Sequence, residues 1–272
     1  MIEIISPGRA FSPLARCIYC NSNDDDLRRE HIIPFGLGGQ VVLPRSSCRK
    51  CEVITGRIEQ IALRGMLGRL RLRLGLPSRR KKVRPNTLPI TFVGPDGTSS
   101  SHHIRVEEYP QYLVTFLMLP PGILMKRAPE ETITVEPRLI VTRKGDEGPA
   151  NWRTSVRIQP WAYLRMLTKI AHSYAVAELG WEAFHQFAPL LPDVILEKSN
   201  LVSHVIGRVG DSDGSGAELH ALCCYSIVLN GMEYLVVDVA LFAMMKAPIF
   251  RVVVGERPAL SGLTDAPTQP SP

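Results

Sequence analysis

The chain has 272 residues, a hydrophobic fraction of 45% and a formal net charge of +6. This length is sufficient for a sizeable core in one or two domains, and no apolar run is long enough to span a membrane. Residues 1–7 lack the basic and apolar regions of an export signal, so a cytoplasmic location with reduced thiols is expected.

Two cysteine pairs are the first informative feature along the chain. Cys17 and Cys20 form one Cys-x-x-Cys pair, and Cys48 and Cys51 form a second one after a gap of 27 residues. Four thiolates around one ion is the tetrahedral arrangement of structural zinc. Two disulfides, or four unrelated core cysteines, are the alternatives. A reducing compartment favours zinc over both.

The segment between the cysteine pairs is predicted to be short and rich in turns. Residues 30–34 indicate a short strand that stops at Pro34. Residues 35–40 contain three glycines, which predicts a tight loop. Residues 41–43 are expected to form a second short strand, closed by Pro44.

From Cys51 the apolar residues recur near the helical period of 3.6 residues, and the pattern continues to about residue 74. Three glycines within this stretch argue against one unbroken helix. The region is also basic: residues 45–84 contain 13 Lys or Arg and two acids, a balance of +11. The remaining residues hold 19 basic and 24 acidic side chains, a balance of −5. Such local charge favours a polyanionic partner over a merely solvated basic helix.

The rest of the chain combines predicted strands with one long helix. Pro160 opens a helix that ends before Gly180. Asn230 and Gly231 are a strong hairpin signal between two strands. The tail from Arg257 is rich in Pro, Ser and Thr, which predicts disorder. Strands are expected over residues 88–93, 102–106, 112–119, 133–141, 219–229, 232–242 and 249–254.

Glu30 and His31 are adjacent within the segment that the cysteine pairs enclose. The pKa of a histidine lies near neutrality, so His31 suits the role of a general base that takes a proton from water. Glu30 and Glu52 offer carboxylate oxygens for a hard catalytic ion such as Mg²⁺ or Mn²⁺. This set predicts metal-assisted phosphodiester hydrolysis. The alternative is that Glu30 balances a neighbouring arginine and Glu52 favours a helix N-terminus.

Three motifs resemble the zinc-binding branch of the HNH endonucleases: Cys17-Ile18-Tyr19-Cys20, Glu30-His31-Ile32-Ile33-Pro34 with Gly38-Gly39, and Cys48-Arg49-Lys50-Cys51. The resemblance covers roughly residues 17–60. It implies a ββα-metal unit of two short strands and a helix around one catalytic ion. It further implies that His31 is the general base, that Glu30 and Glu52 hold the ion, and that the cysteines hold a separate structural zinc.

The chain departs from the family pattern at two places. The middle Asn of the family is missing, because no Asn lies between His31 and Pro85. Its loss weakens the expectation of activity. Glu52 stands where the family usually has Asn or His, which keeps an oxygen ligand and adds negative charge.

Basic residues in and after the motif are expected to contact phosphate groups. Those in the linker would add affinity for nucleic acid that does not depend on nucleotide sequence and that is sensitive to salt. The alternative is a solvated linker that binds nothing. The residues predicted to bind nucleic acid are Arg45, Arg49, Lys50, Arg79, Arg80, Lys81 and Lys82.

The sequence therefore predicts an α+β protein in three parts. Residues 1–84 form a zinc-stabilised HNH unit with a basic helix and linker, residues 85–256 a mixed α+β domain without an assigned role, and residues 257–272 a disordered tail. The expected function is a nuclease that cuts DNA rather than RNA, with no membrane partner. Double-strand cutting by its single site would need a homodimer or two sequential nicks.

Two alternatives to the nuclease stay open at this point. The first is a catalytically decayed, zinc-stabilised nucleic-acid-binding protein, which the missing Asn favours. The second is an interaction protein in which the zinc unit is a scaffold and the basic stretch binds an acidic protein.

Overall fold

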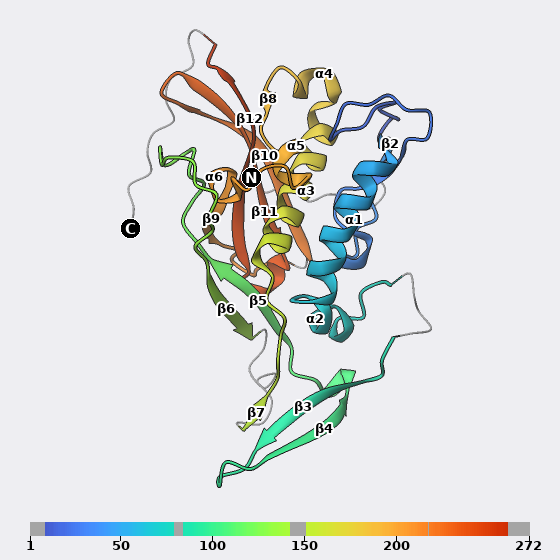
Figure 1. Ribbon diagram of the computed structural model, residues 1–272, viewed down its shortest axis with the longest axis vertical. Coiled ribbons are helices and arrows are strands. Elements are labelled where there is room, and N and C mark those ends of the chain that lie inside the picture. The colour runs from blue at the N-terminus through green and yellow to red at the C-terminus, as the bar shows by residue number, and fades with distance from the viewer. Residues whose placement is uncertain (1–8, 79–83, 142–150, 217, 261–272) are drawn as a thin grey trace.

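The structure is a computed structural model that describes residues 9–78, 84–141, 151–216 and 218–260. These residues form helices and antiparallel sheets, so the predicted α+β class is confirmed (Figure 1). Of the helices in these ranges, none combines the length and the apolarity that crossing a membrane requires.

The N-terminal part is a two-stranded ribbon followed by a helix. Strands β1 (Arg28–His31) and β2 (Val42–Ser47) are antiparallel, and helix α1 (Arg49–Arg64) begins two residues after β2. A second helix, α2 (Gly68–Arg73), follows after a break. A Cβ atom at Gly65 in this break would lie 2.9 Å from the carbonyl oxygen of Ile61, so the glycine allows α1 to end there.

The loop between the two strands is as tight as predicted, but the second strand is longer. The 3-10 helix η1 (Phe35–Leu37) ends at Gly38, whose φ of 88° is a conformation that glycine adopts readily. The prediction that Pro44 closes the second strand is wrong, because β2 continues to Ser47. Pro44 lies at a shift in the strand register opposite Arg29, where a missing N–H removes no bond of the ladder.

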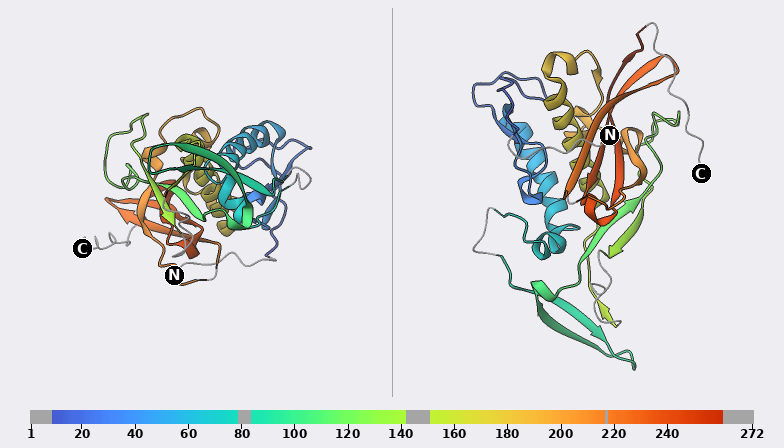
Figure 2. Two further views of the ribbon diagram at one scale, coloured as in Figure 1. Left: turned by 90° about the horizontal axis from the view of Figure 1, so that it is seen from below. Right: turned by 180° about the vertical axis from the view of Figure 1, so that it is seen from behind.

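Helix α3 (Pro160–Leu179) has the predicted bounds and forms the centre of the molecule. It packs on one side against α1 and on the other against the main sheet (Figure 2). All residues from 162 to 177 are buried, as expected for a helix that is covered on every side. Arg165, Lys169 and His172 are therefore buried polar side chains that need partners from the elements around α3.

The main sheet has five strands, and β12 is paired with three of the others. The predicted hairpin at Asn230 and Gly231 is confirmed, with positive φ angles of 52° and 75°. The last strand passes the predicted start of the tail, because Arg257 is still paired with Glu233 at 2.7 Å. Residues 261–272 of that tail lie outside the described residues. The five strands are β8 (Ala188–Pro189), β9 (Ile206–Asp211), β10 (His220–Leu229), β11 (Met232–Leu241) and β12 (Pro248–Pro258).

Two smaller sheets lie between α2 and α3 in the chain. One contains a hairpin that projects from the body of the molecule (Figure 1), and the other is a pair of strands beside the main sheet. Their strands are β3 (Thr87–Val93), β4 (Ser99–Arg105) and β7 (Trp152–Arg153), and β5 (Tyr112–Leu117) and β6 (Glu136–Val141). Short helices that were not predicted are η3 (Val106–Glu108), α4 (Trp181–Phe184), α5 (Pro192–Ile195), α6 (Val202–Val205) and η4 (Ala243–Met245).

Two buried histidines connect the N-terminal part to the rest of the fold. Nε2 of His172 donates to the carbonyl oxygen of Ile18 at 2.7 Å, and Nε2 of His220 donates to that of Leu37 at 2.8 Å. Burial lowers the pKa of each to about 4, because it disfavours the charged imidazolium, although the hydrogen bond to the carbonyl acts in the opposite direction. Both histidines are therefore neutral in the folded protein at neutral pH.

These histidines predict a loss of stability in mild acid. Their pKa is lower when folded than the ordinary 6.5, so the stabilisation is complete above pH 6.5 and is lost as the pH falls toward 4. We expect urea unfolding to show a loss of about 2 kcal/mol per histidine between about pH 7 and about pH 5. His172→Gln keeps a donor for Ile18 but does not titrate, and it should lose about half of this pH dependence. An unchanged pH dependence in that variant would contradict the assignment.

Candidate active site and metal centre

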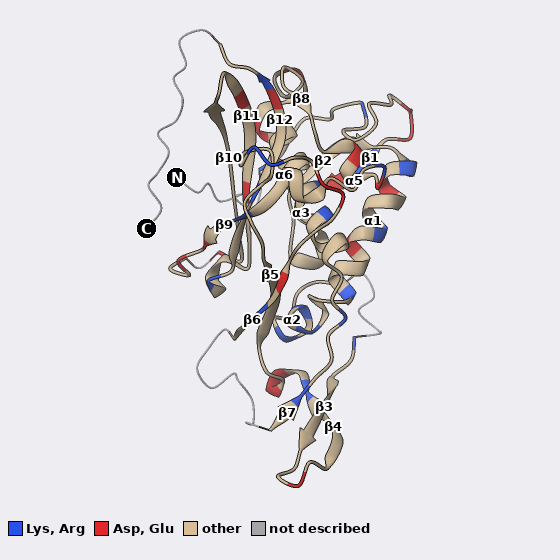
Figure 3. Ribbon diagram, turned by 60° about the vertical axis from the view of Figure 1, so that its left-hand side comes forward, with Lys and Arg blue, Asp and Glu red and all other residues tan. Residues whose placement is uncertain are grey.

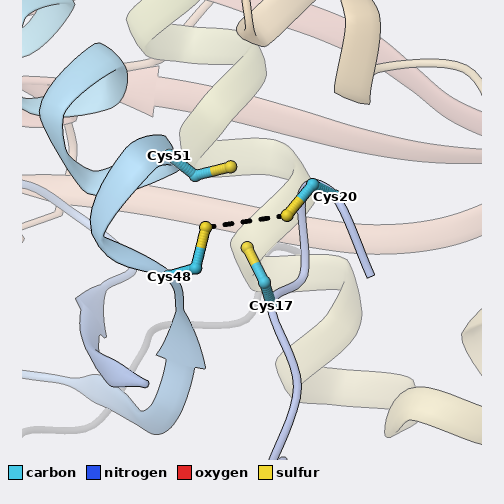
Figure 4. Close-up of side chains that lie close together, drawn as sticks. All are labelled: Cys17, Cys20, Cys48 and Cys51. Atoms are coloured by element: carbon cyan, nitrogen blue, oxygen red, sulfur yellow. Dashed lines mark hydrogen bonds between the residues drawn. The ribbon is translucent and has the colours of Figure 1, made fainter. Parts of the chain in front are cut away.

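Four thiols converge at the start of the N-terminal unit (Figure 4). Cys17 and Cys20 precede β1, Cys48 is the N-cap residue of α1, and Cys51 lies in the first turn of that helix. Their Sγ atoms all lie within 4.8 Å of one another, and those of Cys20 and Cys48 are 3.6 Å apart. Zinc with Zn–S bonds of about 2.3 Å holds tetrahedral sulfurs ~3.8 Å apart. The donor set therefore fits a structural zinc ion.

The arrangement of the thiols does not match the alternative of two disulfides. All four cysteines are free, and 3.6 Å is well beyond the S–S bond length of about 2 Å. The hydrogen bond from the Cys51 thiol is the largest cause that lowers the pKa of Cys17, to about 5. A thiolate is thus favoured within the cluster, and thiolate is the form that binds a soft metal.

Glu30 and His31 point to different sides of β1, because successive residues of a strand alternate. Opposite them on β2 lie Leu43 and Val42 respectively. Glu30 is only 6% exposed. His31 is half-buried, and its ring centroid lies 5.9 Å from that of Phe35. The histidine is thus the more exposed of the two side chains.

A buried cluster of charges connects β1 to α1 and α3. Nζ of Lys169, a residue of α3, lies 2.6 Å from Oε1 of Glu30 and 2.9 Å from Oε1 of Glu59. It also donates to the backbone carbonyl of His31. Burial disfavours the charge on Lys169, but the two carboxylates outweigh this effect and raise its pKa. Burial raises the pKa of Glu30, and Lys169 opposes that rise. We call Lys169, Glu30 and Glu59 the charged triad.

The carboxylates predicted to hold a catalytic ion each contact a basic side chain in this structure. Glu30 contacts Lys169 within the charged triad. Glu52, in the first turn of α1, contacts Arg28 at 3.3 Å. Within the described ranges, the four cysteines are the one group of three or more His, Cys, Asp or Glu side chains whose ligand atoms lie close enough together to share an ion. The roles of Glu30 and Glu52 as ligands stay predictions.

Sequence reasoning missed Lys169 and Glu59, although the sequence carries a signal for each. A lysine in the middle of a helix that is otherwise apolar must find a partner when the helix is buried. Glu59 follows Glu52 by seven residues, so both lie on one face of α1. What the sequence does not show is that this face meets α3.

A cleft of about 620 Å³ opens beside His31. Its walls come from β1, η1, α1, α2 and the segment after α2, and Glu30 contributes to its wall as well. A cleft of this size accommodates a ligand, and its excess of positive charge suits a phosphate group. Its charged side chains are Arg29, Glu30, Glu52, Glu59, Arg64, Arg71 and Arg84.

The residues predicted to bind nucleic acid lie outside this cleft or outside the described ranges. Arg45, Arg49 and Lys50 are exposed near the start of α1, and they do not line the cleft. Their contact with phosphate stays a prediction. Arg79, Arg80, Lys81 and Lys82 lie outside the described residues.

The ribbon, the helix that follows it and the four thiols together define a ββα unit with a cysteine metal site. Residues 17–61 match the family model described as HNH endonuclease. The N-terminal part of the chain is thus an HNH domain, which supports a nuclease in general and implies nucleic acid as the partner. Comparisons with curated proteins and with solved structures found no match.

Proposed function

We propose that the protein is a metal-dependent HNH endonuclease that hydrolyses phosphodiester bonds of DNA in the cleft beside His31. The observation that carries this proposal is the position of His31, which follows Glu30 within the HNH match and lies on the wall of a cleft rich in arginine. The proposed location of the protein is the cytoplasm, and DNA rather than RNA is its proposed substrate.

The residues of the cleft suggest how the reaction proceeds. A ring nitrogen of His31 takes a proton from water as the water oxygen forms a bond to phosphorus. The bond from phosphorus to the departing sugar oxygen breaks, and that oxygen is protonated by solvent. Arginines of the cleft offset the negative charge of the phosphate. The charged triad keeps β1, and with it His31, in a fixed position.

The two proposed metals have different roles. Zinc on the four cysteines fixes the loops around β1 and α1 and takes no part in the reaction. Mg²⁺ or Mn²⁺ is the proposed catalytic ion, and such an ion offsets charge on the phosphoryl group when it is bound.

A nicking assay on supercoiled plasmid tests the proposal. We expect the wild type to convert the plasmid to open circles with Mg²⁺ or Mn²⁺ and to be inactive when neither ion is added. His31→Ala should lower the rate by about 100-fold or more, since a general base contributes about 10²–10⁴. His103→Ala, a change of the same type at an exposed strand position, should leave the rate unchanged.

The same assay also tests the alternative of a decayed site. This alternative is supported by the contact between Glu30 and Lys169, and by the absence of the family's middle Asn. A decayed protein would bind the plasmid in a gel shift without cutting it, and His31→Ala would not change that binding. Equal cutting by wild type and His31→Ala would place the reaction elsewhere. Open circles alone, without linear product, would indicate a single site rather than a homodimer.

A further inference from the structure

The wall of the cleft beyond η1 carries two arginines, Arg71 of α2 and Arg84, whose hydrogen-bond partners are neutral. Arg71 donates to the backbone carbonyls of Gly36, Leu63 and Pro77. Arg84 donates to carbonyls of α2 and of the turn that follows it. Among the residues that the structure describes, neither arginine has a carboxylate within ion-pair distance.

Arg69 and Arg73 of α2 also have only neutral partners. Several other partly buried arginines of this chain contact a carboxylate. Arg165 contacts a carboxylate at 3.7 Å, Arg251 at 2.8 Å and Arg257 at 2.7 Å. Lys and Arg residues are frequent on α1 and α2, as the blue segments of Figure 3 show, and α1 also carries acidic residues in red. The cleft thus has an end at which positive charge is not balanced by acids of the described chain.

The two guanidinium groups also repel each other. The pKa of Arg71 is lowered by burial and, next, by the nearby charge of Arg84. An arginine stays charged nevertheless, because its ordinary pKa is above 12. Backbone carbonyls near helix ends offset part of the repulsion. An anion between the two groups would remove it and would take the N–H groups that carbonyls leave open, since three of the five of Arg71 are used.

We propose that Arg71 and Arg84 form a phosphate subsite that binds the DNA backbone next to the phosphodiester that is cut. The subsite rests on the proposed function for its substrate. It is connected to His31 through η1: Phe35 contacts the ring of His31, and the carbonyl of Gly36 accepts a hydrogen bond from Arg71. Both arginines lie outside residues 17–61, so the family match does not include them.

Gly36 fits this role. A Cβ atom at this position would lie 2.6 Å from a terminal guanidinium nitrogen of Arg71. The absence of a side chain therefore lets Arg71 lie against η1, beside the wall that holds His31. A bidentate guanidinium pair on one phosphate is a common arrangement in phosphate recognition.

Binding of a short fluorescein-labelled DNA duplex of mixed sequence, measured by anisotropy without added Mg²⁺ or Mn²⁺, tests the subsite without cleavage. We expect Arg84→Gln to raise Kd about 10-fold and to lower the slope of log Kd against log salt by about 0.9, the value for one phosphate contact. Arg73→Gln is the matched control. Arg73 lies on the same helix and also donates to a carbonyl, that of Tyr109, but it does not line the cleft. It should change Kd less than twofold.

Wild-type affinity and slope in Arg84→Gln, or an equal loss in Arg73→Gln, would overturn the subsite. So would an absence of any DNA binding by the wild type. If Arg84→Gln does not fold, Arg84→Lys decides: it should keep the salt slope and raise Kd about fivefold, because an ammonium lacks the guanidinium fork. Unchanged affinity in Arg84→Lys would overturn the proposal. The nuclease proposal fails separately, when the wild type binds DNA with this dependence on Arg84 but does not nick plasmid.

Discussion

Replacing Cys48 with serine is expected to remove the bound zinc and to lower the free energy of unfolding by at least about 5 kcal/mol. The reason is that the four thiols lie on two segments, one before β1 and one at the start of α1, which the ion holds together. Zinc analysis of the purified protein and urea unfolding measure the two effects. Serine is close to cysteine in size, so a loss caused only by packing would be small.

Cys223→Ser is the matched control for this prediction. Cys223 lies in β10, outside the thiol cluster, and its replacement should leave the zinc content at one ion per chain. Full zinc content in Cys48→Ser would contradict the four-thiol site. A wild type that is equally stable with and without its zinc would contradict a structural role for the ion.

The charged triad gives the second large effect. Lys169→Met is expected to lower the free energy of unfolding by about 3–5 kcal/mol, because it leaves the carboxylates of Glu30 and Glu59 facing each other without a cation. Methionine fills a similar volume, so little of the loss would come from a cavity. Urea unfolding at neutral pH measures the change.

Two further variants separate charge from packing. Lys198→Met removes an exposed lysine that is paired with Asp193, and such surface pairs contribute 0–1 kcal/mol, so a change below about 1 kcal/mol is expected. Adding Glu30→Gln and Glu59→Gln to Lys169→Met should restore part of the lost stability. If Lys169→Met is as stable as the wild type, the charged triad does not hold β1 in place.

Local sequence signals predicted the elements whose ends are marked by residues with a distinctive backbone preference. Pro160 and Gly180 delimit α3, and Asn230 with Gly231 turns the chain between β10 and β11, because each of these residues restricts or permits a particular backbone conformation. Elements such as β9 and α5 were missed because segments of four to six residues carry only a weak periodic signal. The end of the second strand was predicted wrongly at Pro44 for another reason. The strand register shifts at this position, and such a bulge tolerates a proline that a regular strand would not.

The candidate site was predictable only where its parts lie close in sequence. The cysteine pairs and the Glu30–His31 dipeptide form a compact motif, and the thiol cluster was found from spacing alone. Lys169 lies 138 residues after His31. Arg84 lies outside the motif, at the end of the basic linker that begins at Ser78. No local pattern connects them to the motif, because their proximity depends on how α1 packs against α3 and how the chain turns after α2.

Lys169, His172 and His220 share a property that affects how this site can change. Each comes from the C-terminal two-thirds of the chain, and each donates a hydrogen bond to a main-chain carbonyl of the N-terminal unit. A main-chain acceptor is present whatever side chain its residue carries, so these contacts survive substitution at the position they support. The contacts that hold β1 therefore do not depend on the side chain at position 31, and the proposed general base can be exchanged while the strand stays in place.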